Sequence, residues 1–123
     1  MAGESFDRVD IRIGDRLFLE GDPGDRAYIV QSGTLKITKT GDDDIQKTIA
    51  TVKAGAIIGE IALIDDQPRG ATATALEDAT LTVISAQEFK ARLKSTDPVV
   101  FRLLMIFAKR LRDQNEIIAK SSF

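Results

Sequence analysis

Cysteine and histidine are absent from this chain of 123 residues. Without cysteine the chain has no disulfide, no zinc–thiolate site and no iron–sulfur cluster. Without histidine it lacks the commonest metal ligand and the usual general base at neutral pH, which excludes hydrolases built on a serine–histidine or cysteine–histidine pair. We therefore expect no catalytic residue, no metal and no cofactor, and we predict that the chain is not an enzyme.

Long apolar runs and an excess of basic charge are also missing. No apolar stretch approaches the roughly 18 residues that a membrane-spanning helix needs, and residues 1–5 show no hydrophobic signal region. The formal net charge is −2, whereas nucleic-acid-binding domains usually carry a basic patch or stripe. We expect a cytoplasmic location, no membrane segment and no direct nucleic-acid partner.

Turn signals divide the first two thirds of the chain into short segments rich in β-forming residues. Glycine–aspartate pairs such as Gly41-Asp42 separate these segments. Within residues 34–40 apolar and polar residues alternate, which places Leu35 and Ile37 on one face of a strand. Short strands at spacings of about 8–12 residues are typical of a sandwich or barrel. We predict strands at residues 16–19, 27–31, 34–40, 45–52, 71–76 and 80–84.

The last third of the chain changes to helical signals. Ser85 and Glu88 form a capping box, in which each side chain satisfies a free backbone N–H of the other residue. Asp97 is a good N-cap, and the proline after it is favoured in the first turn of a helix. The predicted domain thus spans residues 1–123, with a β-roll at about 6–85, a short helix at about 86–94 and a long helix at about 98–120.

The long predicted helix carries more apolar residues than one face can bury. We expect one stripe at helical spacing to face the roll: Val100, Leu103, Leu104 and Phe107. Three apolar residues lie off that stripe: Phe101, Met105 and Ile106. This surplus predicts a homodimer through the C-terminal helix, with a monomer as the alternative if the preceding helix covers part of it.

One segment in the middle of the predicted roll, residues 58–71, is mostly apolar but carries one glutamate near its start and one arginine near its end. Gly59 permits a tight turn, and the N–H groups of a helical turn at residues 60–64 would point at an anion. Arg69 would face the same place and can bind two phosphate oxygens at once. Because Glu60 would repel a phosphate but could accept a hydrogen bond from a sugar hydroxyl, the segment indicates a nucleotide site.

These residues resemble the phosphate-binding cassette of cyclic-nucleotide-binding domains, a family that includes the bacterial catabolite activator protein and the regulatory subunit of cAMP-dependent kinase. Residues 59–64 and 68–72 match the cassette without a gap, and residues 14–35 look like the first strands of the family. The resemblance covers about residues 11–120. It implies a jelly-roll-like double-stranded β-helix, or β-roll, followed by a short and a long α-helix.

The resemblance also implies roles for single residues. Glu60 would take the ribose 2′-hydroxyl and Arg69 the cyclic phosphate. Arg112 and Asn115, one turn apart on the long helix, are a possible cap for the base. The remaining residues of the site would frame the pocket, with backbone N–H groups turned to the phosphate or sugar: Gly59, Ile61, Ala62, Gly70 and Ala71.

The chain departs from the family pattern in three respects. Gly70 stands where relatives often have alanine, serine or threonine, so it has no side-chain hydroxyl to offer. The helix that often precedes the roll is missing or shortened. We also expect no DNA-binding, kinase or channel segment after Phe123. In the family a threonine after the arginine often accompanies a preference for guanine, so we expect this chain to bind cAMP more tightly than cGMP.

The sequence therefore predicts a cyclic-nucleotide sensor domain that binds cAMP, with cGMP as the second ligand, and that signals by movement of its C-terminal helix. Two alternatives remain open. The chain could be the sensor fragment of a larger transcription regulator, channel or kinase, or a degenerate domain that serves as a protein-interaction module without nucleotide. The downstream effector cannot be named from the residues.

Overall fold

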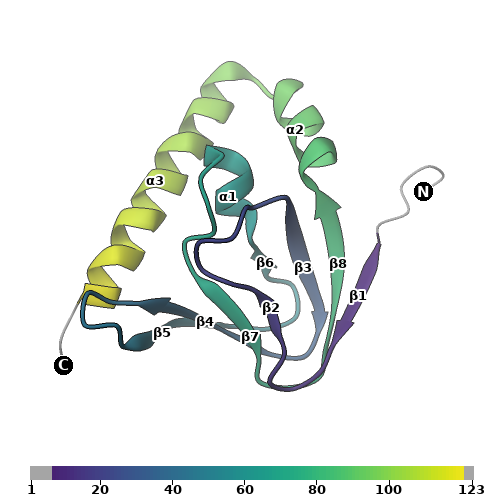
Figure 1. Ribbon diagram of the computed structural model, residues 1–123. Helices are drawn as coiled ribbons and strands as arrows, with labels where there is room; N and C mark the ends of the chain where they lie inside the picture. The colour runs from purple at the N-terminus through teal and green to yellow at the C-terminus, as the bar shows by residue number, and fades with distance from the viewer. Residues whose placement is uncertain (1–6, 121–123) are drawn as a thin grey trace.

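A computed structural model describes residues 7–120 of the chain and shows two four-stranded antiparallel sheets that form a roll (Figure 1). One sheet has the strand order β1-β8-β3-β6 and the other β2-β7-β4-β5. This is the predicted β-roll, whose expected first residue, Phe6, lies outside the described residues. The strands are β1 (Arg8–Ile11), β2 (Arg16–Phe18), β3 (Arg26–Ser32), β4 (Leu35–Thr40), β5 (Gln46–Val52), β6 (Ile57–Ile58), β7 (Thr72–Ala75) and β8 (Ala79–Ser85).

The core of the roll lies between the two sheets and follows the alternation of their strands. In β8 every second residue from Ala79 to Val83 is buried, and the largest fully buried side chains include Leu81 and, across the roll, Leu35. Strand β7, Thr72–Ala75, is built of threonine and alanine only, and Ala73 is completely buried. Small residues here let the sheets approach closely beside the segment that carries the candidate site.

Three helices accompany the roll. Helix α1 (Glu60–Asp65) is the helical turn that the sequence predicts between Gly59 and Arg69. Helix α2 (Ala86–Lys94) begins as expected, with the Ser85 hydroxyl accepting a hydrogen bond of 3.1 Å from the Glu88 N–H. Helix α3 (Pro98–Lys120) begins with the Asp97 carboxylate accepting from the Val99 N–H at 2.8 Å. It runs from α2 past α1 to the β4–β5 pair (Figure 1).

The predicted inward face of α3 is wrong. Of the stripe expected to face the roll, Val100, Leu103 and Phe107 are each more than 40% exposed. The helix instead buries Ala108 and Ala119, and the backbone of Ala119 lies beside Gly41, the residue after β4. No helix within residues 7–120 is long and apolar enough to cross a membrane.

Candidate ligand-binding site

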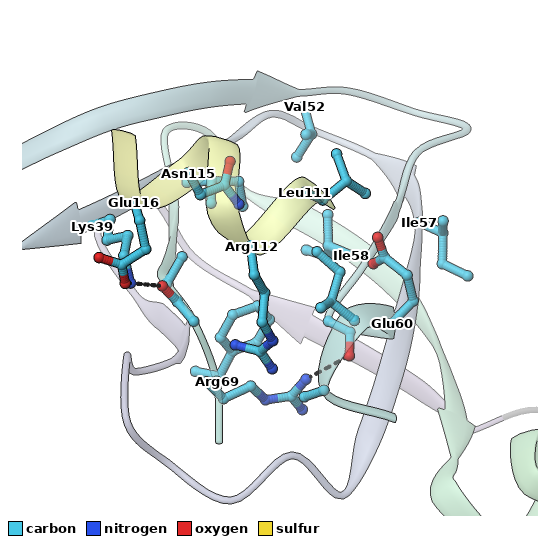
Figure 2. Close-up of a pocket in the computed structure, with 17 residues that line it drawn as sticks. Lys39, Val52, Ile57, Ile58, Glu60, Arg69, Leu111, Arg112, Asn115 and Glu116 are labelled. Atoms are coloured by element: carbon cyan, nitrogen blue, oxygen red, sulfur yellow. Dashed lines mark hydrogen bonds and ion pairs between the residues drawn. The ribbon is translucent and has the colours of Figure 1, made fainter. Parts of the chain in front are cut away.

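A cavity of about 250 Å³ lies between the roll and the distal half of α3 (Figure 2). One wall of the cavity consists of strand residues of the roll, the start of α1 and the loop between α1 and β7. Helix α3 supplies the opposite wall. Every site residue that the sequence predicts lines this one cavity, although the first and last of them, Gly59 and Asn115, are 56 positions apart in the sequence. They are Gly59, Glu60, Ile61, Ala62, Arg69, Gly70, Ala71, Arg112 and Asn115.

Arg69 is a buried cation in the cavity wall, only 4% exposed. Its Nη1 donates to the carbonyl of Gly59 at 2.8 Å, its Nη2 donates to the carbonyl of Arg26 at 2.6 Å, and its Cζ lies 4.4 Å from the centre of the Phe18 ring. Nε is buried without a hydrogen-bond partner. No carboxylate within residues 7–120 forms an ion pair with this guanidinium. Burial lowers the pKa of Arg69, yet an arginine stays charged in proteins.

The backbone around Arg69 explains why the sequence needs glycine at position 59. Gly59 has φ of 79°, a left-handed conformation that glycine adopts without strain. A Cβ at this position would lie 2.6 Å from Arg69 Nη1 and 3.3 Å from the Arg26 carbonyl oxygen. Two backbone hydrogen bonds of 2.8 Å, from Gly21 N to Arg69 O and from Arg69 N to Asp22 O, hold the arginine beside the turn after β2.

Glu60 is the first residue of α1 and lies on the cavity wall, partly buried. Burial raises the pKa of its carboxyl group, while its own backbone N–H and the charge of Arg69 act in the opposite direction. The net shift upward means that the environment disfavours the ionised form more than the arginine favours it. A ligand hydroxyl that donates to this carboxylate would supply the hydrogen bond that water supplies elsewhere.

Arg112 reaches the cavity from α3 and is held by the loop between α1 and β7. Its Nε and Nη2 both donate to the carboxylate of Asp65, the latter at 3.0 Å, and Nη2 also donates to the carbonyl of Pro68 at 2.9 Å. Burial acts to raise the pKa of Asp65, but Arg112 and the Gln67 N–H outweigh it and hold that pKa below its usual value. A Cβ on Gly70 would lie 2.8 Å from Arg112 Nη1.

Lys39 is a cavity residue that the sequence analysis missed. It is 7% exposed, and its ammonium group donates to the Gly70 carbonyl at 2.8 Å and pairs with Glu20 at 3.3 Å and with Glu116 of α3 at 3.0 Å. The sequence contained a signal for it. Leu35, Ile37 and Lys39 alternate along β4, so a strand that turns Leu35 inward also turns the lysine inward.

The rest of the cavity wall is apolar. The middle of the cavity is bounded by Ile37, Val52 and Ile58 of the roll and by Leu111 of α3. Asn115 adds one polar amide from the helix, on the same side as Leu111 (Figure 2). A ligand that fits here would carry one anionic group toward Arg69 and a flat or apolar part toward the strands of the roll.

Comparison with known proteins shows the family. Residues 8–96 match the family model described as cyclic nucleotide-binding domain. The chain is 31% identical over 100 residues to the cyclic AMP receptor protein of Thermus thermophilus, an alignment that covers 81% of the chain and 46% of the relative. It is 30% identical over 99 residues to the cAMP-dependent protein kinase regulatory subunit of Aspergillus niger, covering 80% of the chain and 23% of the relative.

Solved structures agree with this result. The EAL enzyme Bd1971 in its cAMP-bound form matches with a TM-score of 0.83 and 39% identity, covering 89% of the chain and 29% of that protein. The same enzyme in its cGMP-bound form matches with a TM-score of 0.82. The chain belongs to the cyclic nucleotide-binding domain family and is homologous to the sensor regions of cAMP-responsive regulators. It spans 46% of the Thermus relative, 23% of the Aspergillus relative and 29% of the EAL enzyme.

Proposed function

We propose that this chain is a cyclic-nucleotide sensor that binds cAMP most tightly and cGMP less tightly, without catalysing a reaction. The observation that carries the proposal is Arg69. A buried cation without a carboxylate partner is costly to a fold, and its presence in a cavity wall favours a site for an anionic ligand. The cAMP-bound and cGMP-bound forms of the similar EAL enzyme support the choice of ligand.

In this proposal the cyclic phosphate binds Arg69, and backbone N–H groups at Gly70 and Ala71 add further donors. The ribose 2′-hydroxyl donates to Glu60, a carboxyl group whose pKa is raised by burial. The base extends along Val52 and Leu111. Gly59, Ile61 and Ala62 then frame the sugar and phosphate, and Asn115 caps the base from α3.

We infer that the chain acts by binding alone. The residues that line the cavity include neither histidine nor cysteine, and the site offers no nucleophile paired with a general base. A domain that only binds can signal if its ligand favours one conformation over another. We propose that the conformation in question is the position of α3, which contributes one wall of the cavity and contacts the roll through side chains.

We also propose partners for this sensor. The outward apolar face of α3, which includes Val99, Phe107 and Ile117, favours a homodimer through this helix in a cytoplasmic protein. If light scattering at two protein concentrations gives the mass of a monomer each time, the homodimer is contradicted. The short coverage of the relatives supports the second candidate, a sensor segment that controls a transcription regulator, channel or kinase.

Calorimetry of the purified chain with cAMP, cGMP and 5′-AMP tests the proposal. We expect one site per chain, with cAMP tightest, cGMP weaker and 5′-AMP weakest, because a dianionic monoester places a second charge where only Arg69 is uncompensated. If none of the three nucleotides gives heat or raises the melting temperature, the domain serves instead as an interaction module without nucleotide.

A further inference from the structure

We propose that Arg112 is a second phosphate-binding residue, delivered from α3 through the space that the missing side chain of Gly70 leaves open. The inference rests on the proposed function, because it assigns a further contact to the same anionic ligand. It differs from the role that the family resemblance implies for this arginine, which is a cap for the base.

The geometry of the guanidinium supports this assignment. Nε and Nη2 of Arg112 are occupied by Asp65 and by the carbonyl of Pro68. Within residues 7–120, Nη1 has no hydrogen-bond partner and lies beside Gly70, on the cavity wall. Figure 2 shows the Arg112 side chain extending from α3 toward Arg69. Asp65 and Pro68 thus fix the guanidinium near the cassette, with its remaining donors beside the residue that follows Arg69.

Gly70 is a condition for this arrangement. A Cβ at position 70 would come within 2.8 Å of Nη1, a distance at which one of the two groups must move. Any side chain larger than hydrogen would therefore push Arg112 away from the cassette. In the sequence, Gly70 only removes a side-chain contact to the ligand. In the structure, the same glycine leaves room for the guanidinium of Arg112, which comes from α3.

Arg112 and Arg69 differ in whether a carboxylate balances their charge. Asp65 compensates Arg112, whereas Arg69 has no carboxylate partner in the described part of the chain. Together the two guanidinium groups can donate hydrogen bonds to several phosphate oxygens. Only one of their two positive charges, that of Arg69, is not balanced by a carboxylate. A phosphodiester, which carries a single negative charge, fits that balance. The contact would also connect α3 to the part of the ligand that all cyclic nucleotides share.

Arg112→Gln tests the proposal when its affinities for cAMP, cGMP and cyclic IMP are measured by calorimetry. A phosphate contact predicts that all three ligands weaken by the same factor, about tenfold or more for a hydrogen bond from a charged donor. Arg102→Gln, on an exposed position of the same helix, is the matched control and should leave all three affinities unchanged. Affinities within twofold of the wild type, or losses that differ between the bases, would overturn the assignment.

Gly70→Ala supplies an independent variant in a double-mutant cycle. The alanine should weaken cAMP binding in the wild-type background by displacing Arg112, and should have almost no effect when residue 112 is already glutamine. An equal loss in both backgrounds means that position 70 acts without Arg112 and contradicts the proposal. Failure of the proposed function looks different, since the wild-type chain would then bind no cyclic nucleotide at all.

Discussion

The wall of the cavity that the roll supplies and the wall that α3 supplies each present one arginine, but the two are held differently. Arg69 is bound by the backbone carbonyls of Gly59 and Arg26 and is almost fully buried. Arg112 is bound by a carboxylate, Asp65, and remains partly exposed. Carbonyl groups of the roll and its loops hold Arg69 in one place, whereas the pair between Arg112 and Asp65 joins two separate elements, α3 and α1.

The other contacts of α3 have the same character. Glu116 pairs with Lys39, and the Glu116 side chain is about half exposed. Ala108 and Ala119 are small, and several larger apolar residues of the helix, among them Val99, Phe107 and Ile117, are exposed. In the proposed sensor, the roll supplies the buried cation for the anion, while α3 supplies a wall that the ligand can stabilise.

Arg69→Ala should give the largest effect, because it removes the fixed cation of the rigid wall. Truncating one partner of a desolvated charge pair typically costs about 2–5 kcal/mol, which corresponds to roughly 30-fold to several-thousand-fold in affinity for cAMP. The measurement is calorimetry, with circular dichroism to verify the fold. Arg16→Ala, at an exposed position of β2, is the matched control. A folded Arg69→Ala protein that binds cAMP within threefold of the wild type would contradict the phosphate role.

Glu60→Gln should have an intermediate effect on binding. Replacing the carboxylate weakens the acceptor for the ribose hydroxyl, and a hydrogen bond to a charged group contributes about 1.5–3 kcal/mol. The chemical control is 2′-deoxy-cAMP, which should bind the wild type and the variant about equally. If the variant keeps a strong preference for the ribo form, another residue binds the hydroxyl.

The same substitution should stabilise the free domain at neutral pH. Because the pKa of Glu60 is raised in the folded state, the carboxylate reduces stability as pH rises from the ordinary carboxyl pKa of about 4.3 through the raised value. Glutamine has no charge to lose. The difference in melting temperature, variant minus wild type, should therefore grow between pH 4 and pH 7, and a difference that is independent of pH would contradict this account.

Much of this molecule is predictable from the sequence, since local signals act over a few residues. The caps at Ser85 and Asp97 fix where α2 and α3 begin, and the spacing of Glu60 and Arg69 places both on one cavity. Strand β6, Ile57–Ile58, was not predicted, because two residues are too few to show an alternation. The carbonyl of Arg26 that binds Arg69 lies 43 positions away, so no local pattern could reveal it.

The inward face of α3 was not predictable for a different reason. Apolar periodicity indicates which face a helix would bury, but not which partner covers it. In this chain α3 meets the roll at Ala119, beside Gly41, and at Glu116, which pairs with Lys39, while Val100, Leu103 and Phe107 are exposed. The inward position of Lys39 is a partial signal, because a buried lysine requires a carboxylate partner, and Glu116 of α3 is one of its two partners.

Glu116→Gln should give the smallest effect and probes the helical wall directly. It removes the negative charge that holds the end of α3 to Lys39, in a pair whose glutamate is about half exposed. Such pairs contribute about 1 kcal/mol or less, or at most about a fivefold change in local opening. Hydrogen exchange should therefore become faster at residues 113–120 and stay unchanged in the roll. Asp113→Asn, which breaks only the exposed pair with Lys109, is the control for loss of charge on the helix.

Saturating cAMP then tests whether the helical wall responds to the ligand. Exchange should slow across residues 59–71, where the ligand contacts the roll, and also across residues 108–120, because a bound phosphate favours the position in which α3 closes the cavity. The protection of α3 should be larger in Glu116→Gln than in the wild type, since the variant helix opens more often without ligand. Protection confined to residues 59–71 in both proteins would show that α3 is a static wall, and the sensor would then need another route to its partner.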